Sequence, residues 1–285
     1  WKQKLEDEYG SVFVKFGYSS TPLLFEERMY VLVMRRPELN RGDWPKPLDS
    51  FILCIDPKTG KNIFKQTRNF KTLEESYESY SSAIPFDHKG RKEIIVNAAD
   101  HITGHDPETG KELWRYKYTP KLLRWGRNIA SVVTGNGMIF GARARGKEIY
   151  AIKGGAKGEL SEEDLAWTFD GPSPDVCTPL YYKDKLYVLE GSKEKEITCL
   201  KPETGEIIWQ GELPGSAPWR ASPTAADGKI YCISKRGTVV VLDAEANEYK
   251  EICKIDLHKR GCHGSIAIAN KCMFIRTGKI LYCIE

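Results

Sequence analysis

The chain has 285 residues, of which 41% are hydrophobic and 11% aromatic, enough to build a substantial core. Charged residues make up 29%, and the formal net charge of +4 is too mild to indicate a nucleic-acid-binding protein. No apolar run approaches the roughly 20 residues that span a bilayer, so we expect no transmembrane segment. The first residue is Trp1, and we expect any signal peptide or lipid-anchor cysteine to lie outside this sequence.

Six small hydroxyl residues, each followed by a short apolar-rich strand, recur along the chain. They are Thr21, Ser82, Ser131, Thr178, Ser222 and Ser265, and the strands are expected at 29–32, 93–96, 137–140, 186–189, 229–232 and 272–275. Their β-branched and aromatic residues and their flanking turn signals are typical of strands. Six such units in 285 residues give a period of about 47 residues, which suits a four-stranded propeller blade.

A tight-turn unit follows these strands. Its clearest copies are Asp56-Pro57-Lys58-Thr59-Gly60, His105-Asp106-Pro107-Glu108-Thr109-Gly110 and Lys201-Pro202-Glu203-Thr204-Gly205, and looser copies begin at Lys153 and Asp243. Proline sets φ at the first corner of the turn, and glycine accepts the positive φ that returns the chain. An aromatic residue follows each turn, and we predict that Trp114, Trp167 and Trp209 are equivalent buried residues of outer strands.

The eight cysteines include no adjacent pair and no CxxC pair. Cys54, Cys199 and Cys283 recur at one repeat position between apolar residues, which indicates small buried strand residues rather than metal ligands. Cys253 and Cys262 flank an expected loop, and a disulfide between them is left open as an alternative.

Together these patterns predict an all-β fold: a six-bladed β-propeller of four-stranded antiparallel blades, forming one domain over residues 1–285. Seven or eight blades are the alternative. Residues 281–285 match the third strand of a blade, whereas residues 1–5 resemble an outer strand. We therefore expect the N-terminal strand to complete the last blade, which removes an exposed sheet edge.

The Asp-Pro-x-Thr-Gly turn with its following Trp resembles the PQQ-like (pyrroloquinoline-quinone-like) β-propeller repeat family, and so do residues 150–158 and 221–231. This resemblance covers nearly the whole chain and implies a bacterial protein of the periplasm or a secreted one. The family includes quinone-dependent dehydrogenases and a propeller lipoprotein of outer-membrane assembly. The adjacent Cys-Cys pair of the methanol-dehydrogenase-like members is missing. We therefore predict no cofactor and no metal, with the quinone PQQ and calcium as the alternative.

Loops that lead into inner strands and loops that join second to third strands should share one face of a propeller, where ligands favour the mouth of the channel. Ten of the fifteen arginines lie on or beside these loops. The predicted ligand-binding residues are Arg127, Arg220, Arg236, Arg276, Trp125, Trp219, Tyr18, Tyr80, Asp175 and His263. Asp175 and Glu190 are the nearest acidic partners expected for the arginines.

Arginine forms planar paired contacts with carboxylate, sulfate or phosphate groups, and neighbouring indole rings suit an anionic ligand. No Ser-His-Asp or Cys-His set follows from spacing. The sequence therefore favours a non-catalytic binding or scaffold propeller, whose partner is a protein or an anionic small molecule or glycan. The alternative is an enzyme at the same face, either a quinone-dependent oxidoreductase or a lyase or hydrolase acting on acidic polysaccharide.

Overall fold

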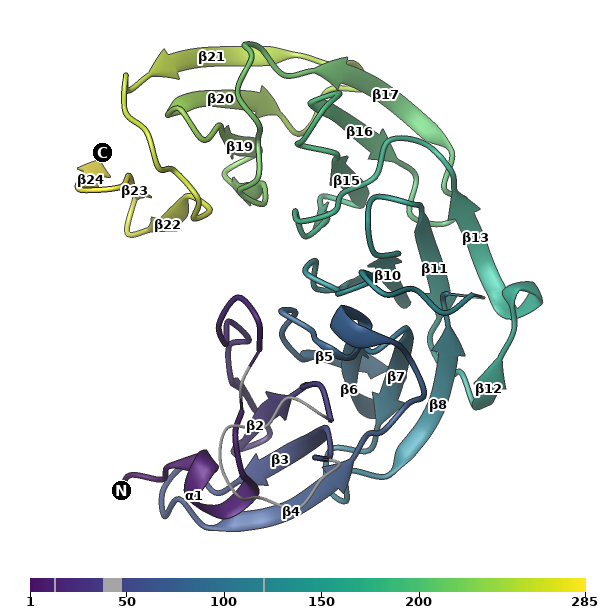
Figure 1. The fold of residues 1–285 in the computed structure, drawn as a ribbon. Helices are drawn as coiled ribbons and strands as arrows, with labels where there is room; N and C mark the ends of the chain where they lie inside the picture. The colour runs from purple at the N-terminus through teal and green to yellow at the C-terminus, as the bar shows by residue number, and fades with distance from the viewer. Residues whose placement is uncertain (13, 38–47, 120) are drawn as a thin grey trace. The chain divides into compact units, whose positions relative to one another are not determined.

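The computed structural model describes residues 1–12, 14–37, 48–119 and 121–285. The described residues form an all-β fold of six sheets that are propeller blades, with one short helix, α1 (Leu5–Tyr9), and two single 3₁₀ turns, Glu74–Tyr77 and Glu162–Asp164 (Figure 1). The six-sheet pattern is the one the repeats predicted, whereas the number of blades in the complete propeller stays a prediction.

The strands have the following bounds. The first sheet contains β1 (Leu23–Phe25), β2 (Arg28–Val33), β3 (Phe51–Ile55) and β4 (Asn62–Thr67). The second contains β5 (Ile84–His88), β6 (Arg91–Ala98), β7 (His101–His105) and β8 (Glu112–Lys117), and β12 (Gly158–Leu160) pairs in parallel with β8. The third contains β9 (Val133–Gly135), β10 (Met138–Ala142), β11 (Ile149–Lys153) and β13 (Leu165–Phe169).

The fourth sheet contains β14 (Leu180–Tyr182), β15 (Lys185–Leu189), β16 (Glu196–Leu200) and β17 (Ile207–Glu212). The fifth contains β18 (Thr224–Ala226), β19 (Lys229–Ile233), β20 (Thr238–Asp243) and β21 (Glu251–Asp256). The sixth contains β22 (Ala267–Ala269), β23 (Cys272–Arg276) and β24 (Leu281–Ile284).

The chain divides into two compact units. Unit 1 comprises Trp1–Val132, Arg143–Arg145 and Ile152–Leu165, and unit 2 comprises Val133–Ala142, Gly146–Ala151 and Ala166–Glu285. Each unit has cores of its own: Tyr30, Leu32 and Cys54 pack with the second sheet in unit 1, and Tyr187, Cys199 and Trp209 pack with the fifth sheet in unit 2. The expectation of one domain over residues 1–285 stays a prediction.

The aromatic residue of the outer strand is buried, as the repeat predicted. Trp114, Trp167 and Trp209 lie on β8, β13 and β17 and are 1%, 9% and 6% exposed. Trp114 lies opposite Gly104 in the ladder between β7 and β8, and Trp209 lies opposite Cys199 in the ladder between β16 and β17. In both ladders the strand register shifts directly after this pair. These indoles therefore occupy the equivalent core positions that were expected of them.

The turn glycine is required by the aromatic residue of a neighbouring strand. Gly205 has a φ of +73°, and a Cβ added there would lie 2.6 Å from the ring of Trp167, whose Nε1 donates a hydrogen bond to Pro202 O at 2.8 Å. Gly110 meets the ring of Phe64 in the same way. The turn and the aromatic residue therefore pack against each other as one repeated contact.

Trp1 docks on a turn of the first sheet in this manner. Its Nε1 donates to Pro57 O at 2.9 Å, and its ring covers Gly60. Residues 1–4 form no strand, and the β22–β24 sheet has three strands among the described residues. Residues 1–5 belong to unit 1 and the β22–β24 sheet belongs to unit 2, and the closure of the last sheet by the N-terminal segment stays a prediction.

The cysteines are all free thiols. Cys54 and Cys199 are fully buried as predicted, whereas Cys283, on β24, is exposed. Cys253 is exposed and Cys262 is buried, so the disulfide alternative is not formed.

Candidate functional site

Three segments of unit 1 that are distant in sequence are held together by hydrogen bonds. Glu75 N donates to Arg124 O at 3.0 Å, and Tyr80 N donates to Asn128 O at 2.8 Å. Ser20 Oγ donates to Ser81 O at 2.8 Å. The loops that lead into β1, β5 and β9 therefore lie side by side, as a propeller requires of equivalent loops.

Two buried carboxylates form the centre of this arrangement. Glu75 accepts from Lys15 Nζ at 2.8 Å and from Arg145 Nη2 at 3.4 Å. Glu78 forms an ion pair with Arg36, whose Nε lies 2.7 Å from Oε1, and it accepts a hydrogen bond from the Tyr80 hydroxyl at 2.8 Å. Both side chains are under 5% exposed, so they act as internal counter-ions for the cations above them.

Large aromatic side chains are exposed on the same surface. Phe16 is 69% exposed and Trp125 is 51% exposed. Lys15 Nζ lies 5.3 Å from the centre of the Phe16 ring and 5.0 Å from that of the Trp125 ring, within the range of cation–π attraction. Arg145 Nε donates to Trp125 O at 2.5 Å and holds that loop in place. We call Lys15, Phe16, Tyr80, Arg124, Trp125 and Arg145 the aromatic–cation surface.

The acidic half of this site was not predicted from the sequence. Asp175 and Glu190 were the expected acidic partners, whereas Glu74, Glu75 and Glu78 pair with the unit 1 cations. The only available signal was the Glu-Glu-Ser-Tyr-Glu run at residues 74–78, which resembles an ordinary solvated segment. Glu190 instead accepts backbone hydrogen bonds from its own loop, including Ser192 N at 2.8 Å and Glu194 N at 2.9 Å.

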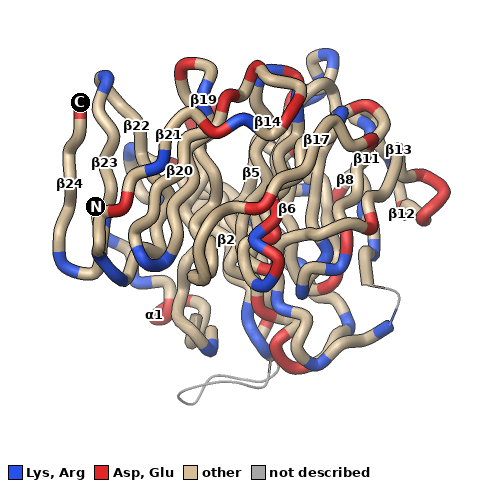
Figure 2. The backbone as a smooth tube through the Cα atoms, turned by 90° about the horizontal axis from the view of Figure 1, so that it is seen from above, with Lys and Arg blue, Asp and Glu red and all other residues tan. Residues whose placement is uncertain are grey.

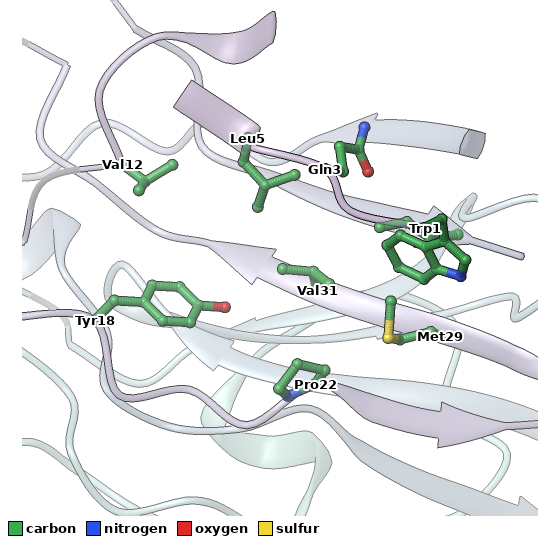
Figure 3. Close-up of a pocket in the computed structure, with 9 residues that line it drawn as sticks. Trp1, Gln3, Leu5, Val12, Tyr18, Pro22, Met29 and Val31 are labelled. Atoms are coloured by element: carbon green, nitrogen blue, oxygen red, sulfur yellow. The ribbon is translucent and has the colours of Figure 1, made fainter. Parts of the chain in front are cut away.

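The predicted site residues of unit 1 separate into two places. Tyr80 and Trp125 belong to the aromatic–cation surface, and Arg127 follows Trp125 on the same loop. Tyr18 lines an apolar cavity of about 260 Å³ against the first sheet, and its hydroxyl donates to Leu32 O at 2.8 Å (Figure 3). The other lining residues are Trp1, Gln3, Leu5, Val12, Pro22, Met29, Val31 and Ile55. Figure 3 labels all of these except Ile55.

The remaining predicted residues belong to unit 2. Arg220, Arg236 and His263 are exposed on loops, Arg276 is exposed at the end of β23, and Asp175 is half-buried. Trp219 is 0% exposed and packs in the core with Cys177 and Leu213. Its expected place at an exposed ligand-binding rim is therefore wrong, because the indole packs inside this core.

A buried carboxyl group lies at the turn between β6 and β7 in unit 1. Asp100 is 1% exposed and has a φ of +64°. Its Oδ2 accepts a hydrogen bond from Thr72, and its Oδ1 has no partner among the described residues. Burial raises the pKa of Asp100 from 3.8 to about 6, because the charged form loses its hydration.

Asp100 makes the stability of the protein depend on pH. Because its pKa in the folded state lies above the unfolded value, its contribution to stability is complete below about pH 4 and is lost as the pH rises through about 6. We expect Asp100→Asn to raise the unfolding free energy near neutral pH by up to roughly 3 kcal/mol and to have little effect near pH 4. Denaturant unfolding at both pH values measures this.

Asp227→Asn is the control, because Asp227 has a similar positive φ of +48° but is exposed. It should give no gain in stability at neutral pH. A loss of stability in Asp100→Asn at both pH values would show that the folded protein needs the ionised carboxylate.

Among the described residues, no three His, Cys, Asp or Glu side chains are grouped in a way that could hold an ion. No helix within the described ranges is long and apolar enough to cross a membrane.

Solved structures share the fold at low sequence identity. The chain is similar to a europium-containing methanol dehydrogenase (TM-score 0.65, 12% identity, 92% of this chain and 61% of that one). It is also similar to the quinohemoprotein alcohol dehydrogenase of Comamonas testosteroni (TM-score 0.61, 14% identity, covering 84% of this chain and 43% of that one). A computationally designed protein, Ika8, matches with a TM-score of 0.61 and 13% identity, covering 90% of this chain and 67% of that one. The chain thus spans about two thirds or less of these structures' lengths.

No curated protein matches the chain. A family model described as outer membrane protein assembly factor BamB matches residues 50–160 and 159–248. These ranges include the second, third and fourth sheets, three of the four strands of the fifth sheet, and the three clear Asp-Pro or Lys-Pro turns. Since the match extends over most of the sequence, this chain belongs to the PQQ-like β-propeller repeat family that includes the assembly factor BamB.

Proposed function

We propose that this protein is a binding module that docks an acidic segment of a partner protein on the aromatic–cation surface of unit 1. One observation carries the proposal: Phe16 and Trp125 are exposed on either side of Lys15, and that lysine is fixed by the buried Glu75. Exposed aromatic residues next to arginine are the composition of binding hot spots in protein interfaces.

The charges of this surface favour an anionic partner. Glu75 and Glu78 are buried, whereas the side chains of Lys15, Arg124 and Arg145 are 43%, 70% and 40% exposed. A partner therefore meets cations and aromatic rings, while the buried Glu75 holds Lys15 and Arg145 in place and the half-exposed Glu74 pairs with Arg124. Such preorganisation lowers the ordering cost of binding.

The family supports a protein partner and a location outside the cytoplasm. The matching family model is named for a factor in outer membrane protein assembly. We extend both properties to this chain as part of the proposal. The enzymatic alternatives have no supporting observation in the described part of the chain, since the likeness to the dehydrogenases at 12–14% identity shows the fold alone.

Calorimetric titration with a pentapeptide of four glutamates around a central phenylalanine tests the proposal. We expect Trp125→Ala to weaken binding by about 30-fold or more, as for a hot-spot residue. Lys15→Ala should also weaken binding, and the affinity of the unaltered chain should fall as salt rises, because exposed charges are screened.

Trp1→Ala and Lys58→Ala are the matched controls. Trp1 is an exposed tryptophan of unit 1, and Lys58 is an exposed lysine, but both lie at the Pro57 turn, at the far end of β3 from the loops of the site. They should bind the peptide as the unaltered protein does. Equal losses in the control and the site variants, or no binding at low salt, would contradict the proposal.

A further inference from the structure

Four loops of unit 2 are joined to one another through their backbones. Lys235 N donates to Pro218 O at 2.9 Å, and Gly261 N donates to Lys235 O at 3.1 Å. Gly278 N donates to Arg260 O at 3.1 Å. The segments 216–220, 235–237, 257–263 and 276–280 therefore form one continuous surface, which we call the basic loop cluster.

The basic loop cluster has a one-sided charge composition. It contains no Asp or Glu. Its basic residues are Arg220, Lys235, Arg236, His258, Lys259, Arg260, His263, Arg276 and Lys279. All of them except the half-buried Lys235 are exposed, and the loop that joins β23 to β24 is blue in Figure 2.

The lysines and arginines of the cluster lack internal counter-ions. None of the seven forms an ion pair with a carboxylate of the described residues, and Arg236 reaches only Ser216 Oγ at 3.4 Å. The aromatic–cation surface of unit 1 differs, because buried glutamates pair with its cations. Like charges held together without a partner repel one another, so an external anion would stabilise the basic loop cluster.

The apolar groups near the cluster indicate which anion fits. Trp219, its only aromatic residue, is fully buried, so no ring is offered for stacking on a sugar or for anchoring a protein. Aliphatic side chains are exposed instead, since Ile280 is 43% and Leu281 is 68% exposed beside Lys279. Cations next to exposed aliphatic groups are the composition of a surface that contacts anionic lipid head groups and the boundary of their acyl chains.

We propose that the basic loop cluster binds the surface of an anionic lipid membrane, with its lysines and arginines on lipid phosphates. A polybasic surface of this size suffices for reversible attachment, because each Lys or Arg near an anionic bilayer contributes about fivefold in affinity. The interaction is independent of the peptide-binding surface proposed for unit 1.

Co-sedimentation with lipid vesicles tests the inference. The full chain is mixed with vesicles of phosphatidylcholine alone and with vesicles in which phosphatidylglycerol replaces part of the phosphatidylcholine. We expect binding only to the anionic vesicles, with release at high salt. The triple variant Arg236→Glu, Lys259→Glu and Arg260→Glu should bind at least about 100-fold more weakly.

A second triple variant controls for net charge. Lys201→Glu, Lys254→Glu and Lys271→Glu change the charge by the same amount at exposed lysines of unit 2 outside the four loops. This variant should keep most of the binding, and circular dichroism should show both variants folded. Equal losses in the two variants, or equal binding to neutral vesicles, would overturn the inference.

Two competitors separate lipid from other anions. Millimolar inorganic phosphate and a hexaglutamate peptide should both leave vesicle binding nearly unchanged. Release by phosphate would assign a small-anion site, and release by the peptide would assign an acidic protein partner; either result overturns the membrane inference. Trp125→Ala should bind vesicles normally, so failure of the unit 1 proposal is distinguishable from failure here.

Discussion

Replacing Trp114 by alanine should lower the unfolding free energy by about 3–5 kcal/mol, the usual cost of truncating a large buried aromatic residue. Trp114 is 1% exposed on β8 of the second sheet. Its Nε1 donates to Glu93 Oε2 at 2.5 Å, and Glu93 is itself fully buried. The truncation therefore opens a cavity and also removes a hydrogen bond from a carboxylate that water does not reach.

Denaturant unfolding of two further variants separates these contributions. Trp114→Phe fills most of the volume but has no N–H, so its cost should be clearly smaller than that of Trp114→Ala. Trp125→Ala, at the exposed indole, should be nearly neutral for stability. If Trp114→Ala and Trp125→Ala cost the same, the assignment of Trp114 to the repeated core position is contradicted.

Replacing Glu78 by alanine should also cost about 3–5 kcal/mol, because it leaves a charged guanidinium without its buried partner. Glu78 is 0% exposed, and the side chain of Arg36, whose Nε lies 2.7 Å from Glu78 Oε1, is 14% exposed. Glu78 also accepts the Lys15 backbone N–H at 3.2 Å, so its loss should loosen the segment that holds Phe16 in place.

Glu206→Ala is the matched comparison for the ion pair. Lys201 and Glu206 approach to 2.6 Å, about as closely as Arg36 and Glu78, but their side chains are 54% and 62% exposed. Water screens an exposed pair, so this substitution should change the melting temperature little. Equal destabilisation by the two substitutions would show that Glu78 is not shielded in the way described.

The repeat was predictable because its residues act locally. The proline and glycine of the turn determine backbone angles, and the aromatic residue four positions later packs on an equivalent turn of a neighbouring sheet. The same logic identified Trp1 as an outer-strand aromatic, and its hydrogen bond to Pro57 matches that of Trp167 to Pro202. Residues 1–4 form no strand among the described residues, and their pairing with the last sheet stays a prediction.

The candidate site was predictable only in part. Propeller topology places equivalent loops together, which is why Tyr80 and Trp125 were found from spacing. Glu75 and Glu78 gave no signal, because only the fold removes them from water and brings them to Lys15 and Arg36. Pairing over such sequence distances depends on the side-chain packing of three loops, and no local pattern encodes it.

Trp219 and Trp125 were predicted from the same loop pattern but lie in different environments. It precedes an arginine on a loop that leads into β18, just as Trp125 follows one on the loop before β9. Trp219 is buried beside Cys177, whereas Trp125 is exposed beside Lys15. The same residue type at similar loops has two environments, and burial is decided by the neighbouring side chains rather than by the loop.

The most direct test of the binding function is an NMR titration that follows the indole N–H signals of the seven tryptophans. Trp125→Phe assigns the signal of Trp125. On addition of the glutamate–phenylalanine pentapeptide, we expect the Trp125 signal to shift, while the signals of the buried Trp114, Trp209 and Trp219 stay in place. No shift at Trp125, or equal shifts at the buried indoles, would contradict peptide binding at the aromatic–cation surface.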